Sequence, residues 1–176
     1  GRGKRTDEGL QVISRLWTED RVDFVGDYYQ LEKATINPKP VQHPMPLWVG
    51  GSAEAAIERT ARWGTGWQAG IETAPEIQPV ILRIKERCAE LGRKIDEDHF
   101  GAGFAVRFGS QHEPIVSKYN EIMRERLGKD PKEYSAIGDA NTMLELLKEF
   151  HAAGAHKFIL RPIADGHADM IHQTKL

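Results

Sequence analysis

The sequence predicts an α/β protein in which four parallel strands alternate with helices. The main observation is the order of its segments. After a first helical segment, short apolar runs occur at 47–51, 66–71, 100–110 and 156–163, and segments with helical spacing separate them. Repeated strand–helix units with short connections favour a parallel sheet. A second observation is the strict alternation of large and small residues within 100–110, which is typical of a curved sheet.

The composition is that of one globular core. The chain has 176 residues, of which 40% are hydrophobic and 28% charged, too few residues for two large domains. The net charge of −2 is spread over interspersed acids and bases, so no basic patch points to nucleic acid or to a membrane surface. No apolar run approaches the roughly 18 residues of a membrane span.

The single cysteine and the first residue each lead to a further expectation. Cys88 alone excludes an internal disulfide framework and favours a reducing, cytoplasmic compartment. The chain begins with Gly1 rather than Met, so we expect a piece of a longer protein.

The first 46 residues precede the first predicted core strand. Apolar residues at helical spacing predict a helix over 7–18. The run RVDFVGDYYQL alternates around a Gly-Asp pair, which indicates a small hairpin, and NPKPVQHPMP holds four prolines and must be extended. We therefore expect one partial domain over 1–176, with 21–46 as an excursion and proline-rich loop.

Four later helices are predicted from their caps and apolar stripes. Ser52 is a good N-cap for a helix that stops at Gly64, and Pro75 opens a long helix that ends at Gly92. Residues 114–127 have helical character. Asn141 would cap a helix carrying Leu144, Leu147 and Phe150 as far as Gly154, and the tail after 163 reads as the start of one more helix.

The strand at 100–110 has two contrasting faces. Large apolar residues such as Phe100, Phe104 and Phe108 fall on one face, whereas Gly101, Gly103, Ala105, Arg107 and Gly109 fall on the other. Small residues on one face suit a barrel wall that faces a ligand or a crowded centre.

The turn VGGSAEAA is the candidate anion site. Free N–H groups at a helix start attract anions, and Gly50 and Gly51 would let a phosphate approach the backbone while Ser52 donates its hydroxyl. The alternative is a tight strand-to-helix turn in which Ser52 only caps the helix. The pattern matches neither the G-x-G-x-x-G fingerprint nor a P-loop.

Two arginines and two tryptophans have open roles. Arg107 and Arg161 lie near strand ends, where each could contact a cofactor or substrate anion or form a salt bridge with a helix carboxylate. Trp48 and Trp67 flank the glycines and could wall a planar ligand, although tryptophan in a strand belongs more often to the core. His167 and His172 are five residues apart, a poor spacing for one metal, and we predict no metal site and assign no catalytic residue.

The ordered set of segments resembles the bacterial luciferase-like monooxygenases, the flavin- or coenzyme F-420-dependent oxidoreductases. Five segments follow one another as in the middle section of proteins of that family: RTDEGLQVISRLWTED, GDYYQL, the proline segment, PLWVGGS and ARWGTGW. The segment GDANTMLELLKEFHAAGAHKFILRPI is similar to the last helix–strand unit of the family. The resemblance implies the C-terminal half of a (β/α)₈ barrel.

The resemblance also implies a cofactor and a site. The cofactor would be FMN or coenzyme F-420 and the substrate a small molecule. Gly50, Gly51 and Ser52 would meet the cofactor phosphate, with Trp67 near the same mouth; Arg107 is a further cofactor-binding candidate because of its place near a strand end. Assisting side chains of relatives, including a histidine, lie largely on the other half. The alternative is a non-catalytic doubly wound nucleotide-binding module, whose strand order would reverse at a switch point. A half barrel exposes two sheet edges, so we expect pairing with a second copy or with the missing half.

Overall fold

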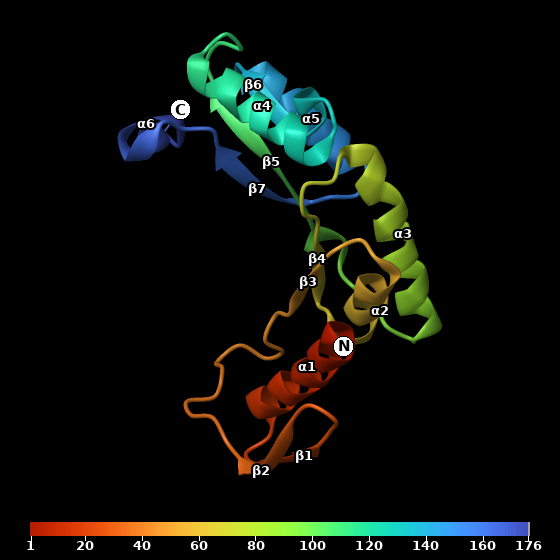
Figure 1. Ribbon diagram of the computed structural model, residues 1–176. Coiled ribbons are helices and arrows are strands. Elements are labelled where there is room, and N and C mark those ends of the chain that lie inside the picture. Colours follow the sequence, from red (N-terminus) through yellow and green to blue (C-terminus); the bar gives the residue numbers. More distant parts are fainter. Residues whose placement is uncertain (176) are drawn as a thin grey trace.

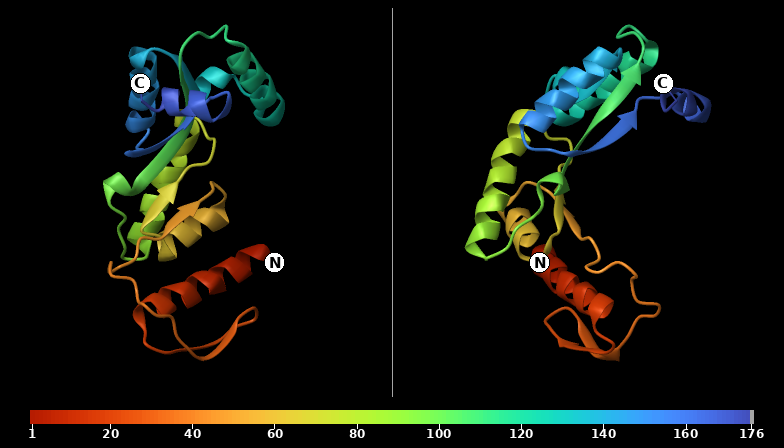
Figure 2. Two further views of the ribbon diagram at one scale, coloured as in Figure 1. Left: turned by 90° about the vertical axis from the view of Figure 1, so that its left-hand side faces the viewer. Right: turned by 180° about the vertical axis from the view of Figure 1, so that it is seen from behind.

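The computed structural model describes residues 1–175 of the chain. It forms a curved body in which the sheet lies on the concave side and several of the helices cover the convex side (Figure 1). The two further views in Figure 2 show the same layers from the side and from behind. Among the described residues, none of the helices combines the length and apolar character needed to cross a membrane.

The N-terminal unit packs below the sheet. Helix α1 spans Arg2–Thr18, longer at its start than the predicted 7–18, and strands β1 (Val22–Val25) and β2 (Gln30–Ala34) pair antiparallel as the predicted hairpin. Glu8 of the helix accepts hydrogen bonds from the backbone of the hairpin turn, including Asp27 N at 3.0 Å, which fixes the hairpin against α1.

The main sheet has five parallel strands. They are β3 (Trp48–Gly50), β4 (Gly66–Gln68), β5 (Phe100–Phe108), β6 (Ser135–Gly138) and β7 (Lys157–Pro162). The predicted parallel α/β arrangement is thereby confirmed. Strand β6 was not predicted, because the short run SAIG follows a turn and carries little apolar signal.

The four predicted strands neighbour one another in chain order, β3-β4-β5-β7. Strand β7 pairs with 101–106 of β5, whereas β4 pairs with 100–101 and β6 with 105–108. Because these registers overlap on β5, β4 and β6 must share one edge of that strand and β7 takes the other. The order does not reverse, as it would in a doubly wound sheet.

Helices α2 (Glu54–Trp63), α3 (Ala74–Glu90) and α5 (Ala140–Ala152) cover one face of the sheet. The large side chains of β5 point into this layer, where the rings of Phe104 and Phe150 stack at 5.6 Å with an interplanar angle of 15°. The predicted two-faced character of 100–110 therefore places the main core between β5 and the helices.

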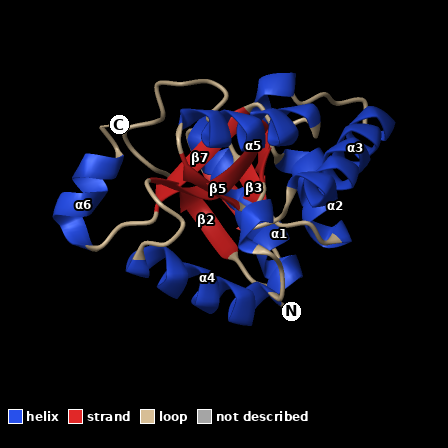
Figure 3. Cartoon of the chain, turned by 90° about the horizontal axis from the view of Figure 1, so that it is seen from above, coloured by secondary structure: helices blue, strands red, loops and turns tan. Residues whose placement is uncertain are grey.

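Helix α4 (Pro114–Leu127) lies on the other face of the sheet, across from α5 (Figure 3). Its Val116 packs with Ala105, Ile137 and Ile163 in a second, smaller core. Small Ala105 leaves room for this contact. Helix α4 therefore packs against the small-residue face of β5, the face that was predicted to meet a ligand or a crowded centre.

Two predicted helix caps differ from the structure. Ala53 occupies the N-cap position of α2, and Asp139 rather than Asn141 caps α5, accepting a hydrogen bond from Thr142 N at 3.0 Å. Leu144, expected on the apolar stripe of α5, is 47% exposed, whereas Met143 is buried. The last helix, α6 (Gly166–Gln173), and the short 3₁₀ turns at Glu97–His99 and Pro131–Glu133 complete the described chain.

Candidate cofactor site

The turn from β3 to α2 leaves a row of free backbone donors. The N–H groups of Ser52, Ala53, Glu54 and Ala55 donate to no acceptor within residues 1–175. The first N–H groups of a helix lack intrahelical partners, and the helix dipole makes this end positive. The turn therefore offers several unpartnered donors to an anion.

Gly51 gives this turn its shape. Its φ of +102° lies in a region that side chains other than glycine rarely adopt. A Cβ built on Gly51 would meet only the Cβ of Ala56, at 3.4 Å, and both Gly50 and Gly51 are exposed. Backbone and solvent thus meet directly at this point, as an approaching phosphate requires.

Trp67 fixes the turn from beneath. The side chain is fully buried in the core, and its indole Nε1 donates a hydrogen bond to the Gly51 carbonyl oxygen at 2.9 Å. The pairing of Gly50 with Gln68 in the β3–β4 register places Trp67 beside the turn. Of its two predicted roles, the structure shows the core role, to which it adds a contact that positions Gly51.

Ser52 does not cap the helix in this structure. Its hydroxyl donates to the carboxylate of Glu72, which also accepts a hydrogen bond from Gly70 N at 2.5 Å. A carboxylate of the chain therefore already lies beside the predicted anion site. Sequence reasoning missed Glu72, although an acid shortly after the strand at 66–71 falls at the same sheet edge.

Arg107 is buried and forms ion pairs with two half-buried carboxylates. Its guanidinium donates to Glu113 Oε2 at 2.6 Å and 2.9 Å, to Asp169 Oδ2 at 2.8 Å and to the Ile163 carbonyl oxygen at 2.7 Å. The structure shows the predicted salt-bridge alternative, with both carboxylates from segments after the strand. Contact of Arg107 with a cofactor stays a prediction. Each nitrogen of its guanidinium already donates a hydrogen bond within the chain, unlike the backbone N–H groups of Ser52–Ala55.

Hydrogen bonds lower the pKa of both carboxyl groups. The Arg107 hydrogen bond is the main cause at Glu113. At Asp169 the largest cause is the backbone N–H of Asp165, followed by Arg107. Both carboxylates are therefore held in the charged form that pairs with the arginine.

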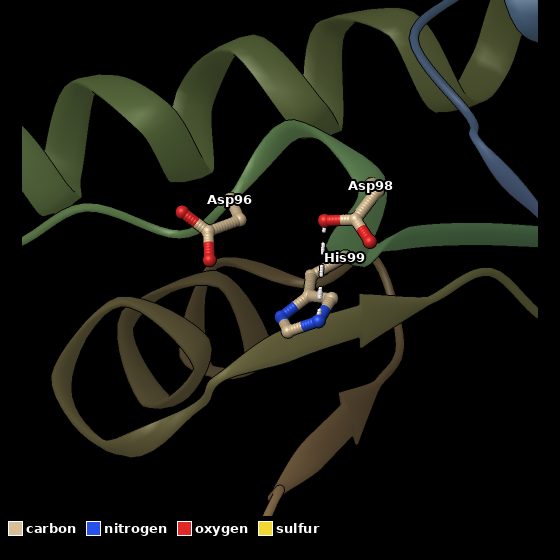
Figure 4. Close-up of side chains that lie close together, drawn as sticks. All are labelled: Asp96, Asp98 and His99. Atoms are coloured by element: carbon tan, nitrogen blue, oxygen red, sulfur yellow. Dashed lines mark ion pairs between the residues drawn. The ribbon is translucent and has the colours of Figure 1, made fainter.

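Asp96, Asp98 and His99 gather at the opposite end of the strands (Figure 4). His99 Nδ1 lies 2.8 Å from the Thr65 carbonyl oxygen, and its Nε2 lies 4.0 Å from Asp98 Oδ1. Both carboxylates are exposed, and Asp98 also lies 3.7 Å from Lys157 Nζ. We interpret this group as a surface cluster of polar side chains that is separate from the turn at Gly51.

Comparison with known proteins identifies the family. The family model for luciferase-like monooxygenases matches residues 1–159. An F420-dependent glucose-6-phosphate dehydrogenase from Nakamurella multipartita is 27% identical over 170 residues, covering 95% of this chain and 49% of that protein. An FMNH(2)-dependent dimethylsulfone monooxygenase from Pseudomonas putida is 28% identical over 95 residues, covering 53% of this chain and 26% of that protein.

Solved structures share the fold. An F420-dependent secondary alcohol dehydrogenase superposes with a TM-score of 0.79 at 20% identity, over 99% of this chain and 60% of that chain. A long-chain alkane monooxygenase superposes with a TM-score of 0.73 at 15% identity, over 99% of this chain and 54% of that chain. Nearly all of this chain aligns with two F420-dependent glucose-6-phosphate dehydrogenases, but it spans only about half of their length. Because the family model matches residues 1–159, the chain belongs to the luciferase-like monooxygenase family.

Proposed function

We propose that this chain forms the C-terminal, cofactor-binding half of a (β/α)₈ barrel in an oxidoreductase that uses FMN or coenzyme F-420. The phosphate of the cofactor would rest on the N–H groups of Ser52–Ala55. The observation that carries the proposal is this row of free donors, beside a glycine with φ of +102°, at the carboxyl end of a parallel strand. The names of the relatives support either cofactor.

Strand order disfavours the alternative of a doubly wound binding module. Such a sheet needs a reversal that would place its crevice between neighbouring strands. Here β3, β4, β5 and β7 follow in chain order, and helices α2, α3 and α5 share one face. This strand order supports consecutive barrel units, whereas α4 on the other face of the sheet departs from that pattern.

The residues of this chain would bind and orient the cofactor. When bound, the cofactor supplies the electrons or hydride for the reaction. Trp67 would hold the Gly51 carbonyl so that the neighbouring amides face outward, and the buried core beneath would keep the turn rigid. Small-molecule substrate would enter from the same end of the sheet, where the strands end.

Glu72 is the group that a cofactor phosphate would have to displace. Two like charges about 4 Å apart repel by about 1 kcal/mol even in water. We therefore expect Glu72→Gln to tighten binding of the cofactor roughly fivefold. Fluorescence titration of the full-length protein with FMN and with coenzyme F-420 measures both the identity of the cofactor and this change.

Glu86→Gln is the matched control for that titration, because Glu86 is an exposed acid on the outer side of α3. It should leave the affinity unchanged. Equal affinities in the Glu72→Gln and Glu86→Gln variants would remove Glu72 from the site. If neither FMN nor coenzyme F-420 bound to the full-length protein, the proposed function would be overturned.

The outer edges of β3 and β7 would pair with further strands. Among the described residues neither edge has a partner strand, and Ile159 and Leu160 of β7 are 50% and 46% exposed. Unpaired edges and apolar residues favour association. Light scattering of the 176-residue chain alone should therefore give at least twice its mass of 19.8 kDa, and a stable monomer would contradict this expectation.

A further inference from the structure

Apart from the turn at Gly51, a hollow lies at the carboxyl ends of β5 and β7. It has a volume of about 510 Å³, which suits a small organic ligand. Ile71, which follows β4, forms one wall, and Ile115 and Ile122 of α4 form another. Because parallel strands all end at the same edge of a sheet, this hollow and the turn at Gly51 open at the same end of the molecule.

The polar groups of the hollow are predominantly cationic. Lys118 and Arg126 of α4 and Arg161 of β7 line it, and no acidic residue does. Within residues 1–175 none of the three forms an ion pair, and the hydrogen bond of Arg161 runs to the Gly103 carbonyl oxygen at 3.1 Å. Arg107, in contrast, is neutralised by two carboxylates. The hollow therefore combines apolar walls with positive charge that the chain leaves uncompensated.

Tyr119 adds a neutral donor to this set. It lines the hollow, and burial raises the pKa of its phenol to about 12, an increase that the nearby Arg161 partly opposes. The phenol thus keeps its proton at neutral pH and can donate it in a hydrogen bond. Donors to a charged oxygen give the stronger class of hydrogen bonds.

We propose that this hollow binds the substrate, and that the substrate is an apolar molecule bearing one acidic group. The inference rests on the proposed function, since the hollow opens at the same end of the sheet as the cofactor turn. The isoleucine walls would bury the hydrocarbon part, with a gain of about 0.8 kcal/mol for each buried CH₂ group. Lys118, Arg126 and Arg161 would attract the acidic head, and Arg161 can offer the paired donors that carboxylates and phosphates prefer.

The test compares ligands that differ only in the head group. Calorimetric titration of the full-length protein with octanoate, octyl phosphate and octan-1-ol should show binding of the two anions at least about tenfold tighter than of the alcohol, because a hydrogen bond to a charged group contributes this much. Arg161→Gln and Arg126→Gln should each weaken octanoate binding and leave octan-1-ol unchanged. Arg161→Lys should keep part of the preference, because it keeps the charge.

Arg124→Gln is the matched control, an exposed arginine on the same helix that does not line the hollow. It should leave octanoate binding unchanged. Equal binding of anion and alcohol, or an effect of Arg124→Gln as large as that of Arg126→Gln, would overturn the proposal. Titration of FMN and coenzyme F-420 on the same variants separates the two hypotheses. Cofactor binding without any anion preference refutes only the substrate class, whereas anion preference without cofactor binding refutes only the proposed function.

Discussion

Replacing Gly51 by valine should weaken binding of FMN or coenzyme F-420 about tenfold or more in the full-length protein. The φ of +102° at this position is strained for any side chain and most strained for a β-branched one. Strain of about 1–3 kcal/mol favours a rearranged turn, in which the amides of Ser52–Ala55 are displaced. Fluorescence titration with each cofactor measures the loss, and Gly51→Ala should give a smaller one.

Gly92→Val provides the control for that loss. Gly92 follows α3, has a φ of +65°, and a Cβ built on it would meet nothing within 4 Å. The variant carries comparable backbone strain at a position remote from the turn, so thermal stability should fall while cofactor affinity stays unchanged. If Gly51→Val bound the cofactor as tightly as the unmodified protein, the phosphate would not lie on these amides.

Much of the fold followed from local sequence patterns. Period-two alternation over 100–110 and the stripe Ile77, Ile81 and Ile84 each specify one buried face, and the structure buries those faces against each other. The missed β6 and the misplaced α5 cap have separate causes. The run SAIG that forms β6 carries little apolar signal, whereas the cap depends on a single hydrogen bond. In GDAN, both Asp139 and Asn141 are good caps, and only the hydrogen bond from Thr142 N decides between them.

The candidate site was less accessible to sequence reasoning. The glycines at 50 and 51 mark a turn, and the free amides follow from any helix start. The partners of Ser52 and Arg107 come from Glu72, Glu113 and Asp169, which lie 20, 6 and 62 residues away. Such pairings depend on how separate units pack, which the spacing of residues in one segment does not record.

Arg107→Met should destabilise the protein by about 3 kcal/mol while leaving cofactor affinity unchanged. The arginine side chain is 9% exposed, and its removal would leave the carboxylates of Glu113 and Asp169 without their shared cation. Breaking a buried pair costs more than the pair contributes, because the remaining charges lose their compensation. Urea unfolding gives the loss of stability. A cofactor titration of the same variant should show unchanged affinity, whereas weaker binding would support the alternative predicted from the sequence, that Arg107 contacts the cofactor.

The pH dependence of stability tests whether the loss in Arg107→Met comes from the unpaired carboxylates of Glu113 and Asp169. Their pKa values are lowered in the folded state, so the stabilisation is present above about pH 4.5, the ordinary range of Asp and Glu, and is lost as the pH falls through the lowered values. The stability difference between the unmodified protein and Arg107→Met should therefore shrink below about pH 4. Adding Glu113→Gln and Asp169→Asn to Arg107→Met should recover part of the loss at pH 7, because the unpaired charges are gone. A loss that is independent of pH and not recovered in this way would mean that the methylene stem of Arg107, rather than its ion pairs, holds β5 to α6.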